Sequence, residues 1–321
     1  MKNPVCEKLL QYQPTNTENE NLRSWYIVIS VFNAFLAFSA ISLNSLTIQA
    51  LRKTSSLPKL LKTLLLSLAV SDLGVGLLVQ PFYLGILVKW LLQYNLPEAV
   101  CTAYHSLAYL FSGVSFFGVM VLSGDRFLAV FLHLRYQELV TYKRVAAVVI
   151  SVWVISAVLS FSILTISLAI YSYIMILLGV LGATLLTMVY IRIYLTVRRH
   201  KSQIQVQQVQ QMAHADQAAD FASLIKSAVG IFYVYFVFLV CYVPDLICLV
   251  VTQMIDPNIV LKGSHMFSLT LVFLNSTLNP VIYCWKMRHI RNAVMNMLRK
   301  MFRQRNRPSH ETLPLAGHTV S

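Results

Sequence analysis

Six stretches of this chain lack Lys and Arg and are long and apolar enough to cross a membrane. Five are single runs with at most one acid each: Ser24–Leu51, Thr63–Val88, Ala99–Gly124, Ser227–Ile255 and Gly263–Trp285. The sixth runs from Val145 to Ile191, carries no Asp, Glu, Lys or Arg, and is about twice the length of one span. It must turn back on itself, which we expect near Ser167–Tyr173. The sequence therefore predicts seven transmembrane helices.

Composition supports an all-α membrane protein with a seven-helix bundle. Only 12% of the residues are charged and 57% are hydrophobic, whereas soluble domains carry about 25% charged residues. The five cysteines match neither a zinc site nor a disulfide framework. Cys241, Cys248 and Cys284 fall inside apolar runs, where a free thiol behaves as a small hydrophobic side chain.

The placement of the basic residues predicts the orientation of the helices. One set of loops holds most of the bases, and it continues into a basic tail: Arg52, Lys53, Lys59, Lys62; Arg135, Lys143, Arg144; Arg198, Arg199, Lys201. The alternate loops hold few: Lys2, Lys8, Arg23; Lys89; Lys262. By the positive-inside rule, residues 1–24 are extracellular, residues 25–285 form the membrane domain and the carboxyl end is cytoplasmic. The net charge of +14 is then a topology signal, and we expect no nucleic-acid partner.

The segments outside the membrane domain have simpler predicted roles. The glutamine-rich stretch Gln203–Gln211 predicts a solvated extension of the fifth helix. Bases alternate with apolar residues at helical spacing in residues 286–303, which predicts an amphipathic helix lying on the lipid of the inner membrane face. Residues 304–321 have the composition of a disordered tail.

Asp72 is an ionisable residue in the middle of the second predicted span, where it is costly and indicates function. The third and seventh spans offer polar partners for one buried cluster: Ser115, Asn275, Ser276 and Asn279. Carboxylate, amide and hydroxyl oxygens suit a monovalent cation such as Na⁺. The alternative is a hydrogen-bonded packing network without an ion. We expect no other cofactor.

Asp125 and Arg126 lie together at the cytoplasmic end of the third predicted span. Adjacent opposite charges at this depth can form a latch, or an ordinary ion pair at a helix end. Pro81, Pro244 and Pro280 each remove a backbone donor inside a span and predict bends that could serve as hinges.

Together these residues resemble the rhodopsin-like (class A) G-protein-coupled receptors over residues 25–303. The matching positions, in chain order, are Asn44, Leu68–Asp72, Cys101, Asp125-Arg126-Phe127, Trp153, Tyr190, Phe238, Cys241, Pro244 and Asn279-Pro280 with Tyr283. The third-span motif carries Phe127 where the family has Tyr, and Tyr242 replaces the sixth-span Trp. Any one motif is weak, but this many in order on successive spans are specific.

The resemblance implies a receptor at the plasma membrane that changes shape rather than catalysing a reaction. It implies that Arg126 contacts a heterotrimeric G protein once Asp125 releases it, and that Tyr190 and Tyr283 stabilise the opened state. The sixth helix would swing outward about Pro244. It also implies arrestin and a receptor kinase as further partners.

Several residues depart from the family pattern. Cys101 normally pairs with a cysteine in the second outer loop, which is very short here and contains none, so Cys6 is the remaining outer candidate. Gly182 stands where most relatives place a fifth-helix proline. Both departures resemble the melanocortin receptors, although Phe82, Cys101 and His105 replace the acidic pocket residues of that group. Leu224 stands where many relatives place an acid that restrains Arg126, which predicts raised basal activity.

The pocket expected from the resemblance lacks three familiar ligand contacts. Ala108 stands in place of the aspartate of amine receptors, and Phe273 stands in place of the lysine of opsins. Adenosine receptors use an asparagine and a histidine, and here Leu249 and Phe273 replace them. The expected lining is Tyr104, His105, Tyr109, Ser112, Tyr171, Asp245, Leu249 and His265. Asp245 is the sharpest candidate for a ligand contact; otherwise it is a neutral carboxylic acid or is bonded to a neighbouring Tyr.

Three other function classes are compared with a ligand-activated receptor. Tyr242 and the missing loop cysteine leave open a constitutively active or non-signalling relative. A transporter would need inverted repeats or polar residues lining several spans, and neither is found. An enzyme would need a metal motif or a nucleophile with a base, and the sequence shows none. The natural ligand does not follow from the sequence.

Overall fold

The computed structural model describes Cys6, Leu9 and residues 11–54, 57–132, 135–207 and 215–305. All regular structure in these residues is helical, and seven helices are long and apolar enough to cross a membrane. The helices are α2 (Asn16–Lys53), α3 (Lys59–Gly74), the π-helix η1 (Val75–Val79), α4 (Gln80–Leu91), α5 (Glu98–Leu132), α6 (Tyr136–Leu139), α7 (Tyr142–Ser162), α8 (Leu168–Gln207), α9 (Ala215–Val251), α10 (Ile259–Lys286) and α11 (Arg288–Arg305).

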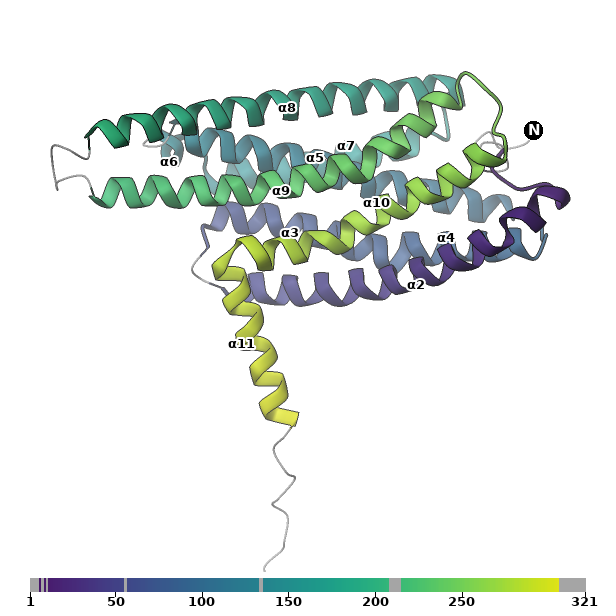
Figure 1. The fold of residues 1–321 in the computed structure, drawn as a ribbon, viewed down its shortest axis with the longest axis horizontal. Coiled ribbons are helices and arrows are strands. Elements are labelled where there is room, and N and C mark those ends of the chain that lie inside the picture. Colours follow the sequence, from purple (N-terminus) through teal and green to yellow (C-terminus); the bar gives the residue numbers. More distant parts are fainter. Residues whose placement is uncertain are drawn as a thin grey trace, which may run out of the picture.

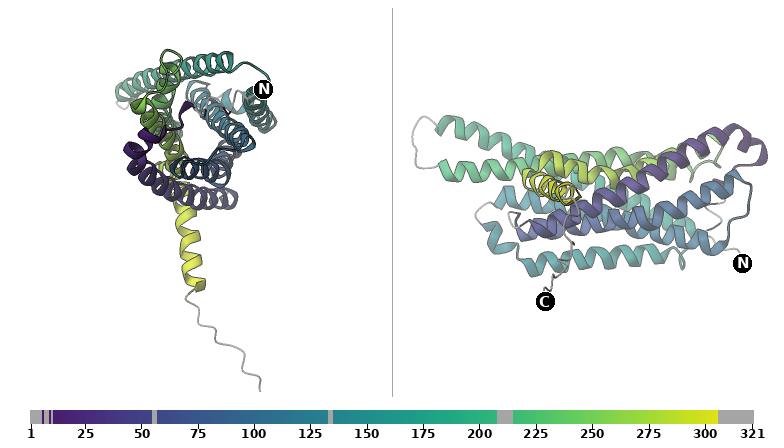
Figure 2. Two further views of the ribbon diagram at one scale, coloured as in Figure 1. Left: turned by 90° about the vertical axis from the view of Figure 1, so that its right-hand side faces the viewer. Right: turned by 90° about the horizontal axis from the view of Figure 1, so that it is seen from below.

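The long helices run side by side in an elongated bundle, with α11 turned away from it (Figures 1 and 2). We call the two ends of the bundle the Cys6 end and the α11 end. The second span is α3, η1 and α4 in succession. At the α11 end, α8 and α9 extend beyond the other helices (Figure 1). The all-α seven-helix fold predicted from the apolar runs is confirmed.

Several helix ends differ from the predicted ones, because capping and water-exposed turns extend helices beyond their apolar runs. Helix α2 begins at Asn16, where Thr15 and Glu18 form a reciprocal capping box. The turn between α7 and α8 occupies residues 163–167 rather than Ser167–Tyr173. Helix α8 includes the glutamine-rich stretch as far as Gln207. Residues 304 and 305 belong to α11, and the rest of the predicted tail lies outside the described residues.

The outer surface of the bundle is apolar, as contact with lipid requires, and small polar groups lie where helices pack closely. In α7, Ser156 and Ser160 are fully buried, whereas Ile150 and Val158 are more than 60% exposed. Small residues allow helices to approach closely where lipid provides no hydrophobic driving force between them. The exposed apolar faces are therefore the surface that a membrane covers.

The second span contains a π-helical segment immediately before Pro81. The proline has no N–H to offer the carbonyl four residues earlier, and η1 widens the helix over this stretch. At Gly74, just before η1, an added Cβ would lie 2.2 Å from the Phe111 ring of α5. Only a glycine lets the second and third spans approach this closely.

Buried apolar residues form two large clusters, one toward each end of the bundle. In α3 the α11-end cluster reaches Leu68, and the Cys6-end cluster starts at Val75 in η1. Between the two clusters, α5 and α10 carry Ser115, Asn275 and Asn279, which are nearly or fully buried. The predicted polar cluster thus lies between two apolar cores.

Helix α11 packs one apolar face against the end of the bundle. Ile290, Val294 and Met297 are buried, while Arg288 and Arg291 are exposed. The helix lies across the long axis of the bundle (Figure 1), the direction expected of an amphipathic helix in a membrane interface.

Candidate functional site

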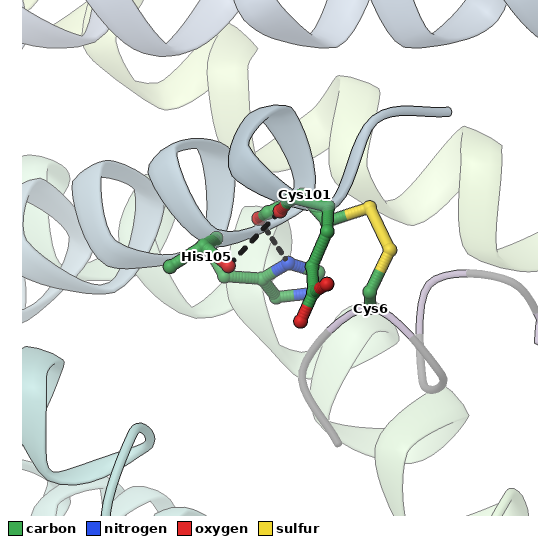
Figure 3. The surroundings of a disulfide bond; sticks show 5 residues. Cys6, Cys101 and His105 are labelled. Atoms are coloured by element: carbon green, nitrogen blue, oxygen red, sulfur yellow. Dashed lines mark hydrogen bonds between the residues drawn. A yellow bond between two sulfur atoms is a disulfide. The ribbon is translucent and has the colours of Figure 1, made fainter. Parts of the chain in front are cut away.

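A disulfide joins Cys6 to Cys101 at the Cys6 end of the bundle (Figure 3). Cys101 lies in the first turn of α5, which begins at Glu98, and the two Cα atoms are 5.2 Å apart. That separation is usual for a disulfide. The structure therefore contains the Cys6–Cys101 pairing that the sequence left as a candidate, and this bond holds Cys6 beside α5.

A cavity of about 240 Å³ opens beneath this segment. Its walls come from α5, α7, α8, α9 and α10 and from two amino-terminal residues. They include every predicted pocket residue except Tyr171: Tyr104, His105, Tyr109, Ser112, Asp245, Leu249 and His265. Tyr171 is not among the residues that line the cavity. Its ring packs edge-on against Tyr109 and beside Ile163, behind the cavity wall.

Asp245 lies in the cavity wall and contacts α10. The Ser268 hydroxyl donates to Oδ1 of Asp245 at 3.0 Å, and His265 Nδ1 lies 3.7 Å from the same oxygen. The Tyr12 ring stacks on His265 with centroids 3.9 Å apart. Sequence reasoning missed Tyr12 and Leu9, which also line the cavity, because no local pattern places the amino-terminal segment there.

Aromatic rings close the inner end of the cavity. Tyr242 stacks on Phe238 within α9, with centroids 4.1 Å apart, and Phe116 of α5 lies 6.0 Å from Phe238. A Cβ on Gly182 would lie 2.1 Å from the Phe116 ring. The ring thus fills the place that a side chain at position 182 would need, which accounts physically for the glycine in α8.

The predicted polar cluster assembles around Asp72. Asn279 Nδ2 donates to Asp72 Oδ2 at 2.8 Å, and the Ser115 and Ser71 hydroxyls are 3.2 Å apart. Asn44 Nδ2 donates to the Ser276 carbonyl at 2.9 Å, which joins α2 to α10. Four spans therefore meet at this layer through polar contacts.

The cluster contains oxygens with no partner among the described residues. They are Oδ1 atoms of four buried side chains: Asn44, Asp72, Asn275 and Asn279. Buried polar atoms are almost always satisfied by protein, water or an ion. Amide and carboxylate oxygens are the ligands that hard cations prefer, so the donor set fits a monovalent cation.

At the α11 end, Asp125 holds Arg126 and a second partner. Arg126 donates through Nε to Asp125 Oδ2 at 2.9 Å and pairs with that oxygen through its terminal nitrogen. The Tyr136 hydroxyl of α6 donates to Asp125 Oδ1 at 2.5 Å. Burial, followed by the bond to Asp125, raises the pKa of Tyr136 above its usual range, so the hydroxyl stays a donor. Nothing in the sequence pattern pointed to Tyr136.

Of the predicted switch tyrosines, Tyr190 of α8 contacts α5 and α9, and Tyr283 of α10 is buried. Tyr190 and Ser123 hydroxyls are 2.9 Å apart, and the Tyr190 ring stacks on Tyr235 of α9 at 4.7 Å. Tyr283 is 1% exposed. The side chains of Leu224 and the residues around it lie outside those that the structure describes.

A further contact joins α9 and α10 at this end. Lys286 Nζ lies 3.9 Å from the centroid of the Tyr233 ring and 3.4 Å from that of Trp285. A cation over aromatic faces is attracted by their negative π surfaces. The last residue of α10 is thereby tied to α9.

Comparison with known sequences identifies the family. The sequence profile of the 7 transmembrane receptor (rhodopsin family) matches residues 43–169 and 165–283. The chain is 34% identical over 135 residues to the histamine H2 receptor of Homo sapiens, covering 42% of this chain and 37% of that protein. It is 30% identical over 138 residues to adenosine receptor A2b of Gallus gallus, covering 43% and 38%. The dopamine D2-like receptor of Drosophila melanogaster is 30% identical over 133 residues, covering 41% and 14%.

The family match covers well over half of the chain, so this protein belongs to the rhodopsin family of seven-transmembrane receptors. It is a multi-pass membrane protein of a receptor family and not of an enzyme family. The chain aligns with less than half the length of the three relatives, and their named ligands are properties of those proteins. The melanocortin resemblance stays a prediction.

Proposed function

We propose that this receptor binds an extracellular ligand in the cavity at the Cys6 end and activates a heterotrimeric G protein by outward movement of α9 at the α11 end. Arg126, released from Asp125, is the group that meets the G protein. Its guanidinium is a fixed cation with five donors, and the carboxyl end of a G-protein helix presents carbonyls with partial negative charge.

The observation that carries this proposal is that α9 connects the two ends. Asp245 and Tyr242 line the cavity, and Pro244 lies between them inside the helix. Farther along α9, Tyr235 stacks on Tyr190, which in turn bonds Ser123 on the helix of Arg126. A ligand that displaces α9 at the proline therefore disturbs the contacts beside Arg126, which makes α9 a candidate two-state element.

The basic-loop asymmetry supports an extracellular Cys6 end and a cytoplasmic α11 end in the plasma membrane. Arrestin and a receptor kinase are proposed as further partners at the α11 end, with α11 on lipid. A carboxyl-terminal tag that is stained in intact cells without permeabilisation would contradict this orientation.

Sodium is proposed as an allosteric ion of the Asp72 cluster. The residues that would hold it are Asp72, Ser115, Asn275, Ser276 and Asn279, whose oxygens suit a small hard cation. When bound, the ion would supply a positive charge that balances the buried carboxylate. The chain's own residues hold α3 to α10 through the Asn279–Asp72 hydrogen bond.

A ligand screen with a G-protein-dissociation readout tests the proposal, using Arg126→Ala at matched surface level as the control. A ligand that signals through the wild type but not through Arg126→Ala supports it. The second candidate is a constitutively active receptor, which the Tyr242 and Leu224 replacements favour. Basal signal far above the Arg126→Ala level without any ligand would support that candidate.

A further inference from the structure

The described part of the amino-terminal segment lies across the mouth of the cavity. Leu9 and Tyr12 are each 3% exposed and line the cavity, and the Tyr12 N–H donates to the Leu9 carbonyl at 3.1 Å. Burial raises the pKa of Tyr12 to about 12, opposed by a hydrogen bond with Thr252. The phenol is therefore neutral and is seated in the protein.

The segment is attached on both sides of the opening. On the α5 side, the Cys6–Cys101 disulfide anchors it beside His105 (Figure 3). On the α10 side, the Tyr12 ring stacks on His265, and Lys262 Nζ donates to the Gln13 carbonyl at 3.1 Å. A strap with a covalent attachment at one side and stacking and hydrogen-bonding contacts at the other can cover the cavity stably.

The α7–α8 connection is too short to cover the mouth. It comprises residues 163–167, and within the described chain neither it nor the other loops contribute to the cavity lining. Leu9 and Tyr12 are the lining residues that come from outside the transmembrane helices. The amino-terminal segment thus supplies the outer wall.

The lining also restricts the chemistry of a ligand. Among the described residues around the cavity, none is Lys or Arg, and Asp245 is the carboxylate. The remaining surface is mostly aromatic and aliphatic. At about 240 Å³ the cavity is smaller than the roughly 300–1,000 Å³ of drug-sized sites. It fits a small apolar molecule with one cationic group better than an anion.

We propose that Leu9 and Tyr12, anchored through Cys6, form the outer wall of the ligand site, that Tyr12 controls entry, and that Asp245 selects a small ligand with an apolar body and a positive charge. This inference rests on the proposed function in that the cavity is the ligand site. A carboxylate can accept several hydrogen bonds, so Asp245 can accept from a ligand cation in addition to the Ser268 hydroxyl and the nearby His265 ring.

Thiol labelling of the full receptor in intact cells tests the gate. The reporter is Leu249→Cys in a Cys248→Ala background, and the probes are membrane-impermeant methanethiosulfonates with a trimethylammonium or a sulfonate group. Tyr12→Ala should raise the labelling rate about tenfold or more, because a buried aromatic ring is worth more than one power of ten in an opening equilibrium. Tyr12→Phe keeps the stacking ring and loses only the hydroxyl that bonds Thr252, so its labelling rate should rise less than that of Tyr12→Ala.

Two controls make the result decisive. Tyr94→Ala removes an exposed tyrosine near the same end and should leave the rate unchanged. The double variant Cys6→Ser with Cys101→Ser should open the site as Tyr12→Ala does; because it could misfold, Tyr12→Ala, which keeps the disulfide, decides the test. Equal rates for Tyr12→Ala and the parent would overturn the gate.

The charge preference tests the ligand class. In the Tyr12→Ala receptor the trimethylammonium probe should react faster than the sulfonate probe, and Asp245→Asn should remove that preference. Equal reaction of both probes before the Asp245→Asn change would overturn the assignment of a cationic ligand. Since labelling needs no G protein, its failure leaves the receptor proposal standing, and a failure to couple leaves the labelling result intact.

Discussion

Removal of the Tyr136 hydroxyl is expected to raise basal signalling. In the structure this hydroxyl donates to Asp125 Oδ1 at 2.5 Å and helps to hold the carboxylate that pairs with Arg126. A hydrogen bond to a charged group contributes about 1.5–3 kcal/mol. Tyr136 is only half-buried, so solvent screening favours the lower end of that range. The Tyr136→Phe change should therefore shift the resting-to-open equilibrium by about tenfold.

The assay is basal G-protein dissociation at matched surface expression. If the open form is about 1% of the resting population, Tyr136→Phe should bring it to about 10%, a rise that the assay resolves. Tyr142→Phe, at an exposed tyrosine on the same side of the bundle, should behave as wild type. An unchanged basal signal in Tyr136→Phe, together with a raised one in Asp125→Asn, would show that Tyr136 does not restrain the latch.

Three further expectations follow from contacts elsewhere. Asp72→Asn should abolish the sodium sensitivity of basal signalling, and superimposable sodium titrations of folded wild type and variant would leave only a packing network. Lys286→Gln should raise basal signal about two- to fivefold by removing a cation from two aromatic faces, whereas Arg288→Gln, at an exposed arginine, should not. The Lys262 contact lowers the pKa of Glu18. The pair therefore stabilises the folded state above about pH 4.3, and this stabilisation is lost as pH falls through the lower pKa of the folded state. The melting temperature should fall more steeply in acid for wild type than for Glu18→Gln.

The spans were predictable because lipid demands long apolar runs, and the structure follows those runs. Their ends were less predictable because a capping box such as Thr15 with Glu18 depends on one or two polar residues outside the run. The α7–α8 turn was placed too late, since an uncharged double-length run carries no local signal for its turn. In the structure Tyr171 packs edge-on against Tyr109, which lines the cavity.

The candidate site was predictable where an ionisable residue lies inside an apolar span. Asp72, Asp125 and Asp245 each stand out in an apolar helix, and each has polar or charged partners in the fold. Tyr12 and Tyr136 were not predictable, because both reach the site from segments outside the membrane and only the tertiary fold brings them there. Cys6 was found because it was the remaining partner for Cys101 at one end of the bundle.

The most direct test of the account compares G-protein dissociation in wild type, Asp125→Asn and Arg126→Ala at equal surface level. Arg126 is 4% exposed and is held by Asp125, so its release is the step that the proposed mechanism requires. The account predicts a basal signal at or above wild type for Asp125→Asn and the lowest signal for Arg126→Ala. A wild-type signal from Arg126→Ala would contradict the mechanism.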